Sequence, residues 1–335
     1  MRLKNSIKNI LNEYPQIVGH KYEIIESSAF IALDDCFRFL NHLGDNSIDA
    51  IVTDPPYGVK EYDLEQIEKM KQGNGGVWRM PPSFDGNTRS PLPRFTALST
   101  KERKYLREYF YEFGQLVGKK LKPGGHIFIA SNSFLSLHVF SALENEKLEF
   151  RGEVVRLVRT MRGGDRPKNF EKAFPDVCSL PRGCYEPWGL FRKPLPPKMT
   201  VGECLKEFGT GGLRRISDDK PFEDVIHDQR TPQVEKKIAK HPSLKPQKFL
   251  RKLVYSALPT GQGVIVDPFM GSGSTIAAAL AVGYEAIGVE KNYEYFKLAI
   301  ESIVELSSLY REPLLEKHNK SLRPTAVPLA LHSGS

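Results

Sequence analysis

The motif Asp54-Pro55-Pro56-Tyr57 places a carboxylate, two prolines and an aromatic ring next to one another, which are residue types that could form part of a site. It follows the apolar, β-branched run Ile48 to Thr53, which predicts a buried strand that ends at a turn. The two prolines restrict the backbone, so the turn is expected to be rigid. The Asp54 carboxylate and the Pro55 carbonyl can accept hydrogen bonds from an amine, and Tyr57 offers a flat face to a planar ring. Such a turn is common in proteins, so a function can be assigned to it only together with other motifs of the chain.

A second candidate site is the glycine-rich segment Asp267-Pro268-Phe269-Met270-Gly271-Ser272-Gly273-Ser274-Thr275, which lies between a predicted strand and a helix of small residues. Glycines permit a tight turn and let backbone N–H groups approach a ligand at the helix N-terminus. Glu290 ends the next predicted strand, 17 residues after Gly273. A carboxylate at that place can accept hydrogen bonds from ribose hydroxyls. The glycine spacing is not that of dinucleotide sites, and the lysine of a triphosphate-binding loop is missing, which disfavours nicotinamide cofactors and nucleoside triphosphates.

Alternating strands and helices are predicted around these two sites. Strands alternating with helices of this length indicate an α/β protein whose sheet is mostly parallel and covered by helices on both faces. The predicted strands are Ile48 to Thr53, Gly125 to Ser131, Gly263 to Val266 and Glu285 to Val289. The predicted helices are Lys101 to Lys120, Leu135 to Leu148, Lys245 to Leu258, Gly273 to Val282 and Tyr293 to Leu306.

The glycine-rich segment resembles the Asp-Pro-Phe-x-Gly-Ser-Gly-Thr/Ser-Thr cofactor motif of the S-adenosylmethionine-dependent DNA amino-methyltransferases. In addition, His241-Pro242-Ser243-Leu244-Lys245-Pro246 is similar to the family's His-Pro-Thr/Ser-x-Lys-Pro element, which helps to hold the methionine part of the cofactor. The resemblance covers about Glu23 to Ile303 and implies a Rossmann-like methyltransferase fold. It implies S-adenosylmethionine as cofactor, no metal, and these cofactor-binding residues: His241, Ser243, Lys245, Asp267, Phe269, Gly271, Ser272, Gly273, Thr275 and Glu290.

The same resemblance gives a catalytic role to Asp54, Pro55, Pro56 and Tyr57. Hydrogen bonds from an exocyclic amine to Asp54 and Pro55 would make its nitrogen more nucleophilic, and Tyr57 would stack on a base extruded from the duplex. In this family an aspartate at the first position is typical of N6-adenine enzymes, so N6 of adenine in double-stranded DNA is the expected target. An N4-cytosine or RNA methyltransferase, and a catalytically silent DNA-binding subunit, remain alternatives.

Motif order and charge predict the domain organisation. The catalytic motif precedes the cofactor motif, which is the circular permutation called the β group. Residues 151–250 hold 21 Lys and Arg against 13 Asp and Glu, which equals the excess of eight in the whole chain and favours a polyanionic partner. We expect a catalytic half at 1–158 with a lid loop at 58–100, a target-recognition insertion at 159–239 with a core strand near 185–192, a cofactor-binding half at 240–312, and a disordered tail at 313–335.

Several basic residues of the middle region are candidates for DNA contacts, and the loop Gly209 to Arg215 is a candidate for a tip that enters a groove. Trp188 and Phe191 are expected to be core residues. The candidate basic residues are Arg156, Arg159, Arg162, Arg166, Lys168, Arg182, Arg214 and Arg215.

Composition sets the remaining expectations. A length of 335 residues accommodates a catalytic domain with an inserted region. The four cysteines lack paired spacing, which argues against a disulfide framework or a zinc site. No long apolar run or secretory signal is present, so a cytoplasmic protein is expected. The expected partners are DNA and a cognate restriction endonuclease, with the enzyme acting as a monomer or a homodimer.

Overall fold

The computed structural model describes residues 3–11, 21–56, 83–84, 87–88, 100–158, 164, 166–167, 169–228, 230–241 and 243–310. Nearly all of the expected lid loop and the whole of the 313–335 tail lie outside these residues. So do five residues singled out by the sequence, namely Tyr57, Arg159, Arg162, Lys168 and Pro242.

Most strands of the described ranges belong to one mixed sheet. In chain order these strands are β1 (Tyr22–Ile25), β2 (Ala29–Leu33), β3 (Ile48–Thr53), β6 (Leu121–Ala130), β7 (Glu149–Leu157), β8 (Tyr185–Arg192), β9 (Val225–His227), β10 (Val264–Asp267) and β11 (Glu285–Glu290). A separate pair is formed by β4 (Ser83–Phe84) and β5 (Asn87–Thr88).

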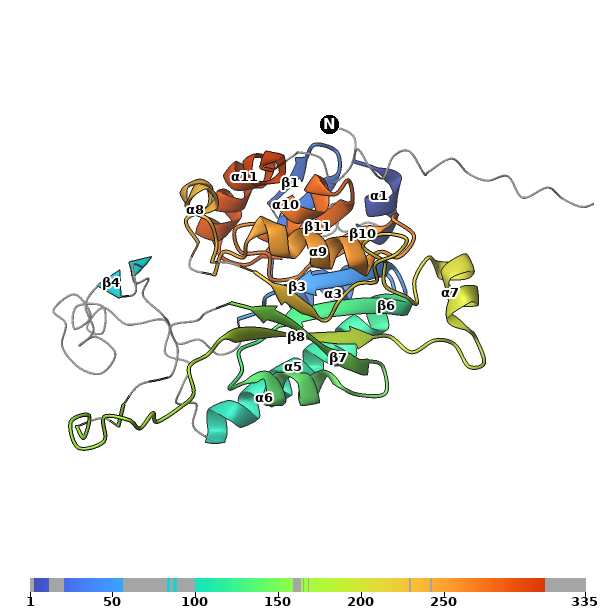
Figure 1. Ribbon diagram of the computed structural model, residues 1–335. Coiled ribbons are helices and arrows are strands. Elements are labelled where there is room, and N and C mark those ends of the chain that lie inside the picture. The colour runs from blue at the N-terminus through green and yellow to red at the C-terminus, as the bar shows by residue number, and fades with distance from the viewer. Residues whose placement is uncertain are drawn as a thin grey trace, which may run out of the picture.

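The centre of the sheet is parallel and its two ends are not. The strand order is β1-β2-β11-β10-β3-β6-β8-β7-β9 (Figure 1). The neighbours β2, β11, β10, β3 and β6 all run in the same direction. At one end β1 pairs antiparallel with β2; at the other end β8 pairs antiparallel with both β6 and β7, and β9 runs parallel to β7. Strands β3, β10 and β11 therefore end at the same edge of the sheet.

Helices cover both faces of this sheet, as expected for parallel strands (Figure 1). One layer contains α3 (Cys36–His42), α5 (Thr100–Lys120) and α6 (Ser136–Leu143). The other contains α9 (Gln247–Ala257), α10 (Ser274–Ala281) and α11 (Tyr293–Ser308). The remaining helices are α1 (Asn5–Leu11), α7 (Val201–Phe208) and α8 (Gln233–Ile238).

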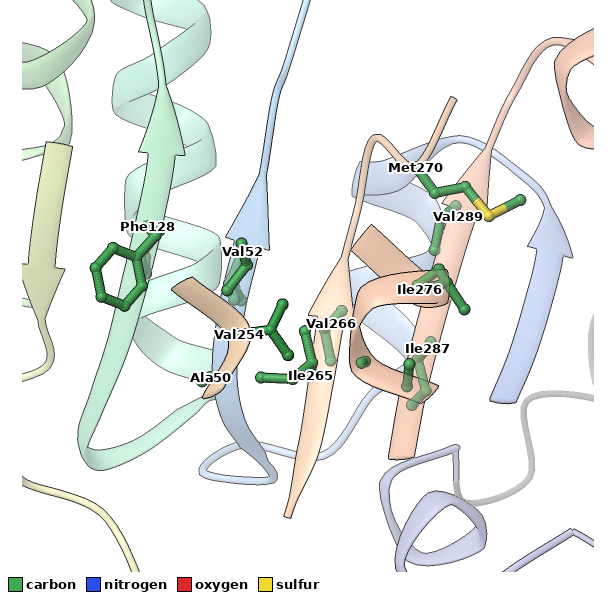
Figure 2. Packing of buried hydrophobic residues seen from close by; sticks show 14 of the residues in the cluster. Ala50, Val52, Phe128, Val254, Ile265, Val266, Met270, Ile276, Ile287 and Val289 are labelled. Carbon is green, nitrogen blue, oxygen red and sulfur yellow. The ribbon is translucent and has the colours of Figure 1, made fainter. Parts of the chain in front are cut away.

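Strand β3 lies in the middle of the core and is buried along its whole length. Figure 2 shows the apolar side chains that α9 and α10 place against the central strands, among them Val254 and Ile276. Asp49 is the charged residue in this strand, and its carboxylate accepts a hydrogen bond from the Val264 N–H at 2.9 Å and pairs with the Lys122 ammonium at 2.5 Å. Burial of this carboxylate is tolerated because both partners are present.

The sequence predictions agree with most elements of the central sheet. The strands expected at Ile48 to Thr53 and near 185–192 are β3 and β8, and Trp188 and Phe191 are fully buried, as predicted. The helix predicted from Leu135 to Leu148 is wrong at its end, since α6 stops at Leu143. Asn145 ends it: its side chain accepts the Lys147 N–H at 2.8 Å, and its backbone bridges to Leu148. No helix within the described ranges is long and apolar enough to cross a membrane.

Candidate active site

The two motifs meet at the carboxyl edge of the parallel strands. Asp54 directly follows β3, whereas Asp267 and Glu290 are the last residues of β10 and β11. Thr53 Oγ1 donates a hydrogen bond of 2.6 Å to Asp267 Oδ1, across 214 residues of sequence. Ligands of open α/β sheets bind in the crevice at this edge. The catalytic and cofactor motifs therefore belong to one site.

Asp54 forms an ion pair that the sequence did not predict. Lys245 lies just before α9, and its ammonium contacts Asp54 Oδ2. Both side chains are largely buried, with 9% of Lys245 and 15% of Asp54 exposed. Pro55 is buried and Pro56 is exposed. The resemblance links Lys245 to the methionine part of the cofactor, but in this structure its ammonium lies on the Asp54 carboxylate.

The glycine-rich loop is held in shape by Glu290. Gly271 and Gly273 adopt φ values of 53° and 80°, in the left-handed region that favours glycine. The Gly271 N–H donates to Glu290 Oε2 at 3.0 Å, and the Asn292 N–H donates to Oε1 at 2.7 Å. Burial raises the pKa of Glu290 above its ordinary value. A carboxylate accepts about four hydrogen bonds, so Glu290 retains capacity for a ligand hydroxyl.

His241 closes the loop from the other side. Its ring makes an edge contact with Tyr295, with 4.4 Å between ring centroids. Its Nδ1 accepts the Ser243 N–H at 3.2 Å. Burial, with a smaller effect of the Lys245 charge, lowers the pKa of His241 to about 4, so the ring is neutral at pH 7. A Cβ added to Gly271 would lie 3.1 Å from His241 Nε2, so a side chain at this position would crowd the imidazole ring.

A narrow cavity of about 40 Å³ lies between these groups. Predicted residues make up most of its wall, which contains Asp54, His241, Ser243, Lys245, Asp267, Phe269, Gly271, Ser272 and Thr275. Two lining residues, Trp188 and Leu250, lie outside the predicted motifs, whereas Met270 and Ser274 belong to the glycine-rich segment but were not predicted to bind the cofactor. Trp188 could not be found from a motif, because it lies on β8, outside both motifs.

The lining offers polar groups and a glycine backbone to a bound cofactor. The Ser272 hydroxyl is buried and finds no hydrogen-bond partner within the part of the chain that the structure describes, so a donor or acceptor for a ligand is present. Asp54 and Asp267 place carboxylates on the wall. The glycine backbone allows close approach of a ligand. Gly273 and Glu290 do not line this cavity, and Glu290 holds the loop through the Gly271 N–H.

The structure contradicts a DNA contact for Arg156, and it shows where Arg214 and the Gly209 to Arg215 loop lie. Arg156 is 5% exposed and pairs with Asp228, so it does not face solvent. Arg214 is held by the Tyr284 hydroxyl at 2.7 Å and by the Tyr255 ring at 4.3 Å from the centroid. The Gly209 to Arg215 loop packs beside the amino end of β6, where the Gly211 N–H donates to the Gly124 carbonyl at 3.0 Å. That edge is opposite to the site, so this loop is not a tip beside the active site.

Similar proteins are DNA methyltransferases. Type II methyltransferase M2.DpnII of Streptococcus pneumoniae is 23% identical over 296 residues, covering 88% of this chain and 96% of that protein. DNA adenine methyltransferase YhdJ of Escherichia coli is 35% identical over 80 residues, covering 24% of this chain and 26% of that protein. The solved structure of the PvuII DNA methyltransferase, described as cytosine-N4-specific, is similar with a TM-score of 0.52 and 15% identity, over 84% of this chain and 91% of that one.

Fold and site together define a Rossmann-like α/β protein in which the Asp54 turn lies beside a glycine-rich loop. The model of the N6/N4 methyltransferase family, described as DNA methylase, matches residues 48–301. The chain belongs to this family.

The raised pKa of Asp267 predicts how the stability of the folded protein depends on pH. Burial, with a further contribution from the Asp54 charge, raises the pKa of Asp267 from 3.8 to about 6. Between these values the folded protein holds a proton that the unfolded chain has released, so the free energy of unfolding falls as the pH rises through this window. We expect Asp267→Asn to remove this fall, which amounts to about 2 to 3 kcal/mol.

Urea unfolding of both proteins between pH 3.5 and 8 measures this difference. Asparagine keeps the size of the side chain and an oxygen that can accept from Thr53, so packing is preserved. The stability of the variant relative to the wild type should rise between about pH 4 and 6 and stay constant above about pH 7. Parallel curves over the whole range would contradict the assigned titration.

Proposed function

We propose that this protein transfers a methyl group from S-adenosylmethionine to N6 of adenine in double-stranded DNA. The observation that carries the proposal is the position of Asp54, which lies beside the glycine-rich cofactor loop at one edge of the sheet. A silent DNA-binding subunit would not need both a carboxylate at the turn and an intact cofactor loop.

S-adenosylmethionine supplies an electrophilic methyl group when it is bound. We propose that Glu290 accepts hydrogen bonds from the ribose of this cofactor, because Glu290 ends β11, the strand beside β10, and retains lone pairs. The methionine part would lie near His241 and Ser243, with Ser272 and Thr275 on the loop beside it. Phe269 packs on Phe113 with 5.3 Å between centroids and gives the loop a fixed apolar base.

The protein promotes the reaction by positioning and electrostatics. The lone pair of an exocyclic amine is delocalised into the base, which makes the nitrogen a poor nucleophile. Its two N–H groups would donate to the Asp54 carboxylate and the Pro55 carbonyl, and the nitrogen would become more pyramidal. Pro55 and Pro56 keep this turn from relaxing. Tyr57, outside the described residues, is proposed to stack on the extruded base.

Two features favour adenine over cytosine. The motif begins with aspartate at Asp54, which the resemblance associates with N6-adenine enzymes. The protein YhdJ, which shares 35% identity over 80 residues, is named a DNA adenine methyltransferase. The fold similarity to a cytosine-N4-specific enzyme does not discriminate between the two bases, because both classes share this fold. N4-cytosine in DNA, or a base in RNA, stays the competing target.

The segment between β7 and β8 is proposed as the DNA-binding part of the 159–239 insertion. Strand β7 ends, and β8 begins, at the same edge of the sheet as Asp54. The described residues of this connection are mostly exposed and include Arg166, Lys172 and Phe170. Basic and aromatic side chains suit contacts with phosphates and bases. The catalytic turn would then belong to the half at 1–158, and the cofactor would bind to the half at 240–312.

The biological setting follows from the substrate and remains a proposal. DNA as substrate places the enzyme in the bacterial cytoplasm. The similar protein M2.DpnII is named a Type II methyltransferase, and a cognate restriction endonuclease is therefore proposed as a functional partner. Monomeric and dimeric forms are both compatible with the site, because all of its described residues come from one chain.

The catalytic role of Asp54 is tested by Asp54→Ala. We expect methyl transfer to fall by at least about a thousandfold, because the acceptor of the amine hydrogen bonds is lost. Affinity for S-adenosylmethionine, measured by calorimetry, should change by less than about threefold, because the loop and Glu290 are untouched.

Asp45→Ala is the matched control for this variant. Asp45 also pairs with a lysine, at 3.0 Å from Lys120, but lies outside the site. This control should transfer methyl groups at the wild-type rate. Turnover by Asp54→Ala close to the wild-type rate would contradict the role of Asp54.

The proposed DNA surface is tested by comparing Arg166→Ala with Arg215→Ala. Each arginine Nε donates to a carbonyl of its own loop, Arg166 to Pro175 at 2.8 Å and Arg215 to Asp218 at 3.2 Å, but the loops lie at opposite edges of the sheet. Only Arg166→Ala should weaken DNA binding, and it should reduce the slope of log K against log salt by about one. Fluorescence anisotropy at several salt concentrations measures both, and equal effects of the two variants would contradict the assignment.

A further inference from the structure

Lys245 lies between two carboxylates, of which only Asp54 belongs to a recognised motif. Its ammonium contacts Asp54 Oδ2 and lies 3.8 Å from Glu186 Oε2. Of the Glu186 side chain, 18% is exposed. Removing an ammonium from its carboxylate in such surroundings is strongly unfavourable unless another anion receives it. Glu186 is an anion within reach of a small side-chain movement.

The ion pair on Asp54 conflicts with the proposed reaction. A hydrogen bond between two charged groups is about twice as strong as one that involves neutral partners. The amino group of a base is neutral and competes poorly with the Lys245 ammonium for Asp54 Oδ2. The other oxygen, Asp54 Oδ1, is buried, so an incoming amine has to bind Asp54 Oδ2, and it can do so only after the ammonium has moved off.

Glu186 is held rigidly in the place where it can receive this ammonium. It precedes Trp188, which pairs with Ala130 at the end of β6, so Glu186 lies at the site edge of the sheet. Trp188 Nε1 donates to Glu186 Oε1 at 2.8 Å. Glu186 Oε2 is the oxygen nearest to Lys245, and it is also 3.5 Å from Arg156 Nη1. One oxygen is thus fixed by Trp188, and the other faces the two cations.

Arg156 is in turn fixed by its own partners. Its Nε donates to Asp228 Oδ2 at 2.7 Å, and its guanidinium lies 5.2 Å from the centre of the Phe249 ring. Among the described residues, the ion pairs of this network join the carboxylates of Asp54, Glu186 and Asp228 to the cations of Lys245 and Arg156. A shift of Lys245 from Asp54 to Glu186 leaves the total buried charge of the network unchanged.

We propose that Glu186 is a positioning residue that receives Lys245 when the target amino group takes its place on Asp54. Glu186 thereby acts on the substrate through Lys245 and Asp54 without touching it. The inference rests on the proposed function, because it requires an amine that binds to Asp54.

The variant Glu186→Gln tests this role. Glutamine keeps an oxygen for Trp188 but offers Lys245 no charge, so Lys245 stays on Asp54. We expect kcat to fall about tenfold, with the KM for S-adenosylmethionine changed by less than about twofold. The matched control is Glu149→Gln, which removes a carboxylate that pairs with Arg192 at 2.8 Å across the same two strands, away from the site. This control should retain the wild-type kcat.

A binding measurement that needs no turnover separates positioning from a structural effect. Duplex DNA carrying the methylation motif, identified beforehand by sequencing modified bases, is titrated in the presence of a cofactor analogue without a transferable methyl group. Glu186→Gln should weaken binding about tenfold in the wild-type background and not at all in a Lys245→Met background, where no ammonium competes for Asp54.

Three results have distinct meanings. Equal losses from Glu186→Gln in both backgrounds would overturn the inference, because the effect would not pass through Lys245. A wild-type kcat for Glu186→Gln would overturn it as well, while leaving the proposed function intact. Absence of methyl transfer by the wild-type protein would instead contradict the proposed function.

Discussion

The hydrogen bond from Thr53 to Asp267 is the constraint on which the rest of the site depends. It joins the last residue of β3 to the last residue of β10, and these strands pair in parallel with Val266 beside Ile51. The bond is buried, so its loss would leave the buried Asp267 carboxylate without the hydrogen bond from Thr53. Because Asp54 and Phe269 follow within two residues, this contact and the pairing of the two strands together bring the Asp54 turn next to the glycine-rich loop.

The antiparallel end of the sheet is as important to the site as its parallel centre. Strand β8 supplies Trp188 to the cavity wall and Glu186 to the charge network, and β7 supplies Arg156. The same two strands carry the exposed connection that is proposed to meet DNA. The segment that is proposed to bind DNA and the charged side chains near Asp54 therefore belong to the same two strands.

Strands and turns that depend on local residue patterns could be predicted from the sequence. Contacts between residues that are distant in the sequence could not. The β-branched run at Ile48 to Thr53 and the glycines of the cofactor loop have few local alternatives, so their structures could be predicted. The contact of Lys245 with Asp54 joins residues that are distant in sequence, and no local pattern encodes it. Arg156 lies in the basic part of the sequence, as a DNA-binding arginine would. In the structure, however, it is buried and pairs with Asp228, which is 72 residues away in the sequence.

The central claim is that one site unites these motifs to methylate the exocyclic amine of adenine. The most direct measurement incubates the purified protein with unmethylated double-stranded DNA and S-adenosylmethionine whose methyl group carries deuterium. Mass spectrometry of the digested nucleosides then identifies the labelled base. The account predicts deuterated N6-methyldeoxyadenosine. Label found only in N4-methyldeoxycytidine, or in no nucleoside, would contradict it.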